Sequence, residues 1–156
     1  MNSIENAIGE LCKFLIQIPE ESYLGNFDSS IAICTLSSME LLKKIANSEI
    51  LNDISIVGRL LSENKGIDSI IKYVNQNKKT KTIIICGKEV WGHKAGHSLF
   101  ELHKNGIDDY GRIINSTSPN HFLTVTKSEI IYFQNQLNLV NLINETNFDT
   151  IKKFII

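Results

Sequence analysis

Short runs of aliphatic residues, separated by amphipathic stretches, limit most strongly what this chain can fold into. The clearest run is Thr82–Cys86, which reads TIIIC and ends at Gly87. Ile31–Leu36 and Ile54–Val57 have the same character. Since they are apolar at consecutive positions and rich in β-branched residues, these runs are typical of strands that are buried on both faces of a parallel sheet.

Helical spacing appears between the predicted strands. Ile67, Ile70, Ile71 and Val74 form one stripe of an amphipathic helix, and 126–129 (TKSE) has the spacing of a capping box. Further predictions are a helix capped by Ser38, a helix over 93–104 that stops at Gly106, strands at 112–114 and 139–143, a last helix over 148–154, an N-terminal helix over about 2–18, and a loop over 20–30.

This alternation predicts a Rossmann-like α/β domain of three layers, with a mainly parallel sheet and helices on both of its faces. The chain has 156 residues, 42% hydrophobic and 21% charged, which is ordinary globular composition. It contains no internal repeat or convincing linker. We therefore expect a single domain over residues 1–156, with its core at about 31–143.

Charge and composition exclude several classes of function. The formal net charge is −1, so we expect no nucleic-acid partner. No secretory signal is visible, and no run approaches the roughly 20 apolar residues that span a bilayer, so we expect no insertion into a membrane. The 3 cysteines contain no CxxC pair, which favours a reducing cytoplasm.

Ligands of open α/β sheets bind beyond the carboxyl ends of the strands. In this chain that rule selects residues 35–38, 58–66, 87–96 and 115–119. The third stretch, with three glycines around a histidine, is the main candidate. The candidate cofactor-binding residues within these stretches are Thr35, Gly58, Glu63, Asn64, Gly66, Glu89, Gly92, His93 and Gly96.

His93 allows several interpretations. If His93 and His97 are both helical they share a face and could bind zinc, although Lys94 stands where the HExxH motif has glutamate. Alternatively, His93 could be an axial ligand of a metal in a macrocycle, with Glu89 or a backbone carbonyl holding its second nitrogen. A histidine at the start of a helix can also be only a cap or a surface residue.

A longer pattern resembles a known family, the A subunit of tetrahydromethanopterin S-methyltransferase. The motifs that carry the resemblance are ISIVGRLLSENKGID at 54–68, IIICGKEVWGHKAG at 83–96 and LHKNGID at 102–108. The match continues through 112–114 and 133–136, and its order and spacing hold from about 31 to 143. Together these motifs are specific, whereas any one alone is not.

The resemblance implies a Rossmann-like fold that holds cobalamin or a related cobamide, with His93 as the lower axial ligand of cobalt. In this archaeal family the cobalt accepts a methyl group from methyl-tetrahydromethanopterin and passes it to coenzyme M, in a complex coupled to sodium export. It also implies that other methyltransferase proteins are the partners and that this chain is the methyl carrier.

Some features depart from the family pattern. We expect no counterpart of the family's C-terminal transmembrane helix, His97 replaces a common glutamine, and 116–125 lacks a glycine-rich turn. Two alternatives therefore stand beside a methyl carrier. One is a non-catalytic binding or assembly domain that has lost the cofactor, and the other is a zinc-binding protein that uses His93 and His97.

Overall fold

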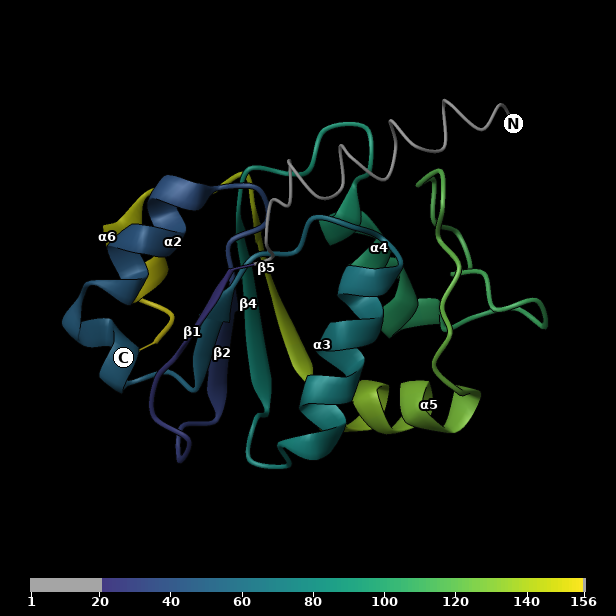
Figure 1. The fold of residues 1–156 in the computed structure, drawn as a ribbon, viewed down its shortest axis with the longest axis horizontal. Helices are drawn as coiled ribbons and strands as arrows, with labels where there is room; N and C mark the ends of the chain where they lie inside the picture. Colours follow the sequence, from purple (N-terminus) through teal and green to yellow (C-terminus); the bar gives the residue numbers. More distant parts are fainter. Residues whose placement is uncertain (1–20, 156) are drawn as a thin grey trace, which may run out of the picture.

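A computed structural model describes residues 21–155. Its centre is a five-stranded sheet in the order β1-β3-β2-β4-β5 (Figure 1). The strands are β1 (Ser22–Leu24), β2 (Ile31–Cys34), β3 (Ile56–Gly58), β4 (Thr82–Gly87) and β5 (Asn138–Ile143). The three aliphatic runs of the sequence thus form the three adjacent strands β3, β2 and β4, which confirms them as buried strands.

All strands except β1 run parallel, which confirms the mainly parallel α/β sheet. Two predictions about strands were wrong. β1 lies within residues 20–30, which were predicted as a loop, and it pairs antiparallel with β3. Residues 112–114 form only isolated bridges, Ile107 with Ile113 and Arg112 with Phe122, so they do not join the sheet.

Three helices cover one face of the sheet (Figure 1): α3 (Lys65–Gln76), α4 (Ala95–Asn105) and α5 (Lys127–Gln136). Their apolar stripes pack onto the side chains of alternate sheet residues. Buried members of this core include Ile67, Ile71 and Val74 of α3, Leu99 and Leu102 of α4, Ile130 and Phe133 of α5, and Ile83 and Ile85 of β4.

The opposite face is covered by α2 (Met39–Ala46) and α6 (Phe148–Lys152), with a 3-10 turn η1 (Glu49–Asn52) beside them. Leu41, Leu42 and Ile45 of α2 and Ile151 of α6 pack against Ile84 and the other sheet residues that alternate with the first set. Helices on both faces confirm the three layers. None of the helices within residues 21–155 has the length and apolar character needed to cross a membrane.

Helix ends follow the local sequence in most places. Thr126 and Glu129 form the predicted capping box, since the Thr126 hydroxyl accepts from the Glu129 N–H and the Glu129 carboxylate accepts from the Thr126 N–H. Gly106 ends α4 as predicted. Ser38 does precede α2, but its hydroxyl accepts from the Lys88 N–H instead of capping. The predicted N-terminal helix lies outside the described residues.

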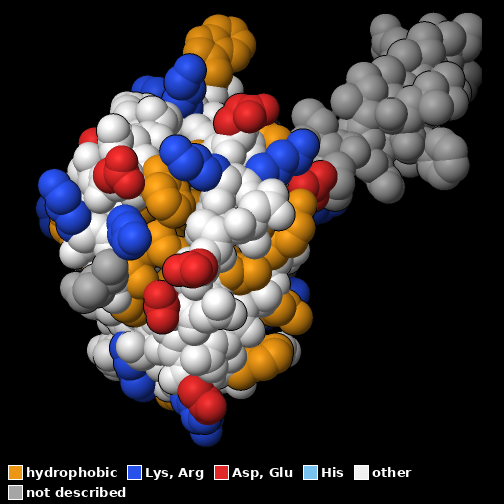
Figure 2. Space-filling model, turned by 90° about the vertical axis from the view of Figure 1, so that its left-hand side faces the viewer, with side chains coloured by type: hydrophobic (Ala, Val, Ile, Leu, Met, Phe, Trp, Pro, Cys, Tyr) orange, Lys and Arg blue, Asp and Glu red, His pale blue; other side chains and the backbone are white. Residues whose placement is uncertain are grey.

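The surface carries both signs of charge. On the side of the molecule formed by α2 and α6, Lys and Arg side chains alternate with Asp and Glu side chains (Figure 2). Small apolar areas lie between them. Such a mixed surface provides no single-sign field for steering a strongly charged partner on this side.

Candidate functional site

The carboxyl ends of β2, β3 and β4 meet at one edge of the sheet. Thr35 is fully buried there and its N–H donates to the Gly58 carbonyl at 2.9 Å, which joins the ends of β2 and β3. Gly87 ends β4 with a positive φ of 77°, and a Cβ at this position would lie 2.2 Å from the Thr35 oxygen. Only glycine fits this close approach, so two strand ends are held together at the edge.

His93 lies in the turn that connects β4 to α4. Gly92 and Lys94, its neighbours, have φ of 76° and 48°, both in the left-handed region. Because α4 begins only at Ala95, His93 is not helical and does not share a helical face with His97. The prediction that the helix begins at His93 was therefore wrong.

The imidazole of His93 is held by Glu63. The Nδ1 atom of His93 lies 2.9 Å from Oε2 of Glu63, a residue only 1% exposed. The other carboxylate oxygen, Oε1, accepts from the backbone N–H of Asn120 at 2.9 Å. An ionised carboxylate can only accept, so Nδ1 donates, and in the neutral imidazole the lone pair then lies on Nε2. The side chain of His93 is 51% exposed, which leaves Nε2 accessible to a ligand.

Glu89 does not hold His93, contrary to the expectation from its nearness in the sequence. Its carboxylate accepts instead from the backbone N–H groups of Val90, Gly96 and His97, at 2.7–3.0 Å. These donors include two unpaired N–H groups of the first turn of α4, so Glu89 acts as a helix cap. The carboxylate that holds the imidazole of His93 is that of Glu63, which follows β3, whereas Glu89 follows β4.

Gly96 and Gly92 differ in their surroundings. A Cβ on Gly96 would lie 2.9 Å from the Glu89 carboxylate and 3.0 Å from Ile143, so glycine here allows α4 to approach its cap. A Cβ on Gly92 would meet nothing within 4 Å. Gly92 therefore lies in open space beside His93, and it is the glycine of the two that leaves room for a bulky ligand.

Asn64 and Gly66 help to form the start of α3. The side chain of Asn64 accepts from the Lys65 N–H, and the N–H of Gly66 donates to the Ser62 hydroxyl at 2.8 Å. Gly66 is buried. These bonds stay within the segment that carries Glu63, so the two predicted site residues anchor that segment and act on His93 only through it.

The loop over 115–121 completes the site, and the sequence indicated its position but not its contacts. The Ser98 hydroxyl bonds the hydroxyls of Ser116 and Ser118, at 2.6 Å and 2.5 Å. The N–H of Thr117 donates to Nε2 of His97. This network fixes the loop against α4 and thereby positions Asn120 for its bond to Glu63. The sequence selected 115–119 as the stretch after a predicted strand at 112–114, a strand that does not join the sheet.

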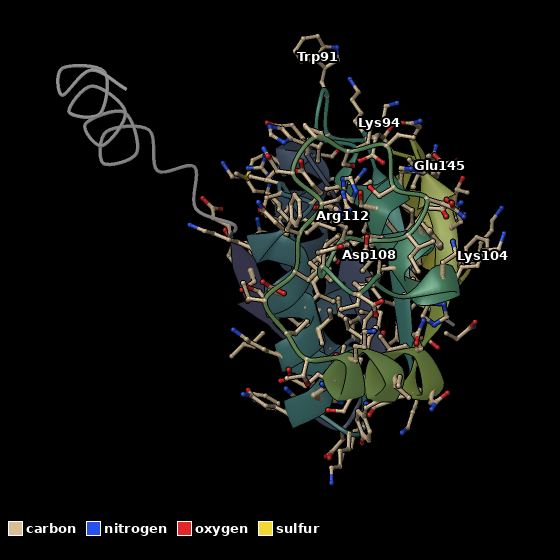
Figure 3. All side chains as sticks on the ribbon, turned by 90° about the vertical axis from the view of Figure 1, so that its right-hand side faces the viewer. Trp91, Lys94, Lys104, Asp108, Arg112 and Glu145 are labelled. Carbon is tan, nitrogen blue, oxygen red and sulfur yellow. The ribbon has the colours of Figure 1, made fainter. Side chains whose placement is uncertain are left out.

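Trp91 projects from the loop beside His93 (Figure 3). Its side chain is 95% exposed, and Lys94 lies close below it in the same view. A large aromatic side chain is thus exposed next to the half-exposed imidazole of His93.

The described residues offer little for a metal site built from protein ligands alone. Between residues 21 and 155, no group of three or more His, Cys, Asp or Glu side chains could hold a metal ion. Burial raises the pKa of the Cys86 thiol, which disfavours the thiolate that zinc requires. The zinc interpretation loses its geometric basis, because His93 and His97 do not share a face. A single open imidazole nitrogen suits an axial ligand better.

Comparison of the sequence with known proteins identifies a family. The family model MtrA, described as the A subunit of tetrahydromethanopterin S-methyltransferase, matches residues 16–156. A relative from Methanosarcina barkeri, the A subunit of "Putative methyltransferase Mtx", is 38% identical over 133 residues, which are 85% of this chain and 64% of the relative. The tetrahydromethanopterin S-methyltransferase A subunit numbered 1 in Methanothermobacter thermautotrophicus is 35% identical over 131 residues, 83% of this chain and 53% of the relative.

The chain thus spans between about half and two thirds of the length of these relatives, which come from archaea. The match covers β1 to α6 and includes every residue of the site described above. This chain belongs to the MtrA family, the A subunits of tetrahydromethanopterin S-methyltransferase.

Proposed function

We propose that this chain binds a corrinoid, such as cobalamin, through His93 and carries methyl groups between other methyltransferase proteins. The observation that supports this most directly is the His93–Glu63 pair. It presents one imidazole nitrogen to the surface and holds the other at 2.9 Å on a buried carboxylate. Membership of the MtrA family supports the same role.

The donor set suits such a cofactor. A metal-bound histidine usually donates its second N–H to a carboxylate, which fixes the tautomer and the ring orientation. Glu63 is placed to do this for His93. The corrin already supplies four nitrogen ligands to cobalt, so one protein imidazole is sufficient and a cluster of protein ligands is not required. A bound corrinoid would supply a nucleophilic cobalt for methyl transfer.

The remaining residues would place and orient that cofactor. Gly92 leaves the space beside His93 open, so a large planar ligand can lie close to the backbone. Glu63, whose carboxylate also accepts from the Asn120 N–H, holds the imidazole in one orientation. Trp91 and Lys94 stand at the rim, where a partner protein that donates or accepts a methyl group would approach (Figure 3).

The test is titration of the purified protein with cobalamin, followed by its absorption spectrum, in wild type, His93→Ala and His103→Gln. His103 is a suitable control because its ring bonds the Leu137 carbonyl, away from the site. We expect the spectrum of cobalamin to change with wild type and with His103→Gln but not with His93→Ala. Cobalt coordination by an imidazole changes the ligand field of the metal, which the spectrum reports directly.

Two results would contradict the proposal. An unchanged spectrum with wild type, in every oxidation state of cobalt, would favour a non-catalytic assembly domain that has lost the cofactor. An equal change with wild type and His93→Ala would show that a different residue, or none, binds the metal. Thermal unfolding of each variant confirms that it is folded.

A further inference from the structure

The two edges of the sheet differ in how they are protected against pairing with another strand. β1, at one edge, has only three residues, all with exposed side chains. β5, at the other edge, has six residues that pair with β4 in unbroken parallel register. Figure 3 shows β5 in yellow-green at the right-hand margin of the sheet. Among residues 21–155 no strand pairs with its outer side, so β5 offers a long open edge.

β5 lacks the features that usually protect such an edge. Natural sheets commonly use charged residues, prolines, bulges or very short edge strands to prevent edge-to-edge pairing. β1 is such a short strand. The sequence of β5, NLVNLI, contains no charged residue and no proline, and no bulge interrupts its register with β4. This edge is therefore suited to pairing with a further strand.

The apolar side chains of β5 are left half-buried by the rest of the described chain. Leu139 and Ile143 pack against the core that α3, α4 and α5 cover. Val140 and Leu142 pack against the core on the opposite face, beside α2 and α6. Asn141, between them, is exposed. A further strand would complete the burial of all four apolar side chains, on both faces at once, which favours association.

The backbone of β5 also presents hydrogen-bonding groups on its outer side. The N–H groups of Asn138 and Asn144 donate to carbonyls at the two ends of β4. Since donors alternate along a parallel strand, the N–H groups of Leu139, Asn141 and Ile143 point outward. Ile143 donates to the Oδ1 atom of Asn141 at 3.1 Å. Within the described chain, the N–H groups of Leu139 and Asn141 remain for a partner strand.

A second copy of this chain fits the edge in one register. A two-fold axis makes the two β5 strands antiparallel and presents the same residues from both copies. With the axis at Asn141, Leu139 faces Ile143 of the second copy. Val140 then faces Leu142 of the second copy, so apolar side chains meet on both faces. Moving the axis by one residue sets Asn141 opposite Leu139 or Ile143 instead. Because β5 carries no charge, pairing with itself opposes no like charges.

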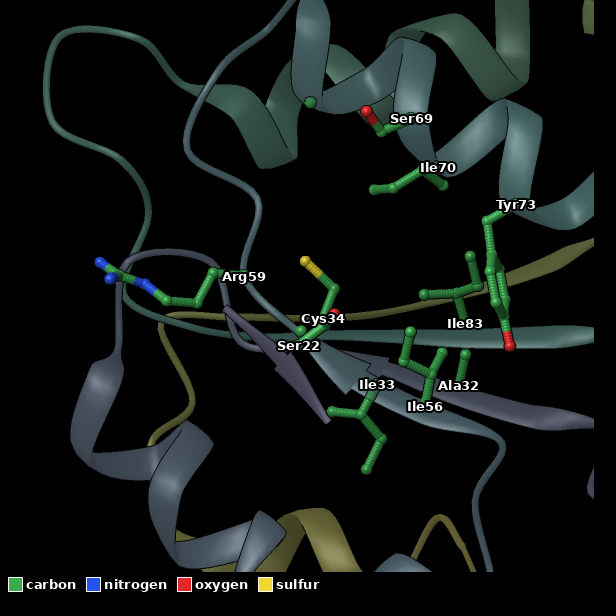
Figure 4. Close-up of a pocket in the computed structure, with 12 residues that line it drawn as sticks. Ser22, Ala32, Ile33, Cys34, Ile56, Arg59, Ser69, Ile70, Tyr73 and Ile83 are labelled. Carbon is green, nitrogen blue, oxygen red and sulfur yellow. The ribbon is translucent and has the colours of Figure 1, made fainter. Parts of the chain in front are cut away.

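From these observations we infer that the chain forms a two-fold dimer through β5, in which the two sheets join into one continuous sheet. This inference does not rest on the proposed function. The pocket of about 250 Å³ between α3 and the sheet is lined by residues of β1 to β4, of α3 and of the segment between β3 and α3 (Figure 4). No residue of β5 lines it, so pairing at β5 does not occupy this pocket.

The experiment measures the mass of the particle in solution by analytical ultracentrifugation for wild type, Asn141→Lys, Asn141→Asp and Asn52→Lys. Asn52 is exposed in η1, before β3, and two strands separate β3 from β5, so it controls for the added charge. We expect wild type and Asn52→Lys to have twice the mass of one chain. In each Asn141 variant like charges oppose each other at the axis, which weakens the dimer on the order of tenfold or more.

Mixing the two Asn141 variants tests the register, because the lysine of one copy then faces the aspartate of the other. We expect the mixture to form the dimer at a concentration where neither variant does so alone. A mixture that stays monomeric, or a dimer that both variants keep unweakened, would overturn the inference. The mass of wild type is a test that does not depend on the variants, and a wild type that is monomeric at every concentration would also overturn it.

Discussion

At the scale of single residues, Glu63 determines which nitrogen of His93 is available. Its carboxylate has two acceptor oxygens, one on the His93 Nδ1 and one on the Asn120 N–H, at 2.9 Å each. Because the carboxylate is buried, these bonds have little competition from water. In the neutral imidazole the pair therefore fixes the tautomer that presents the lone pair of Nε2.

Replacing Glu63 by glutamine tests this role. The amide would keep its oxygen on the Asn120 N–H and present an NH₂ group to His93, so that Nδ1 accepts and Nε2 carries the proton. We expect cobalamin to bind Glu63→Gln about 10- to 100-fold more weakly than wild type, the range for losing the outer partner of a metal ligand. Spectral titration measures this, and Glu101→Gln on α4 is the control. Unchanged affinity would show that Glu63 has no positioning role.

At the scale of elements, α5 illustrates how a local motif fixes a helix end. Thr126 and Glu129 satisfy each other's backbone N–H groups, as their spacing in the sequence predicted. The N–H and hydroxyl of Thr126 lower the pKa of the Glu129 carboxyl below its ordinary value, because both bonds favour the charged form. The stability of the start of α5 therefore depends on pH.

The sign of this coupling gives a prediction. A carboxyl with a lowered pKa in the folded state stabilises the protein above its unfolded pKa, about 4.3, and loses that contribution as the pH falls through the folded value. We expect wild type to melt at a higher temperature than Glu129→Gln at pH 7, and the difference to narrow below about pH 4. The melting temperatures of wild type and Glu129→Gln are measured by circular dichroism at several pH values. A difference that is constant with pH, or one matched by Glu49→Gln, would contradict this explanation.

At the scale of the whole molecule, the site exists because loops from distant parts of the chain meet at one edge. Gly87 is central to this meeting, since its α-carbon approaches the Thr35 carbonyl too closely for any side chain. The ends of β2 and β4 can adjoin only with glycine there. The loop that carries His93 follows β4, and the loop that carries Glu63 follows β3, whose end is joined to β2 by the Thr35–Gly58 hydrogen bond.

Gly87 and Gly92 form a matched pair for testing this packing. Both have a positive φ, so alanine at either costs about 1–2 kcal/mol from backbone conformation. Only Gly87→Ala adds a clash with backbone, and we expect it to destabilise the protein by roughly 1–3 kcal/mol more than Gly92→Ala. Urea unfolding of both variants measures the difference. Equal losses would show that the strand ends can separate without cost.

The amino-acid sequence by itself determined the class of the fold and the motifs of the site. Aliphatic runs identified β2, β3 and β4, and the 3.6-residue period identified α3, because these signals depend on local burial. It also located His93 at the end of the clearest strand. It missed β1, since a three-residue edge strand with exposed side chains carries no such periodicity.

Only the tertiary structure decided which side chains meet. The partner of His93 is Glu63, 30 positions away, and the nearby Glu89 caps α4 instead. Asn120 contributes its backbone N–H to the site, and the type of a residue does not predict such a backbone contact. Such contacts between distant residues follow from how the strands are ordered and how the loops pack, and sequence spacing along one element does not encode them.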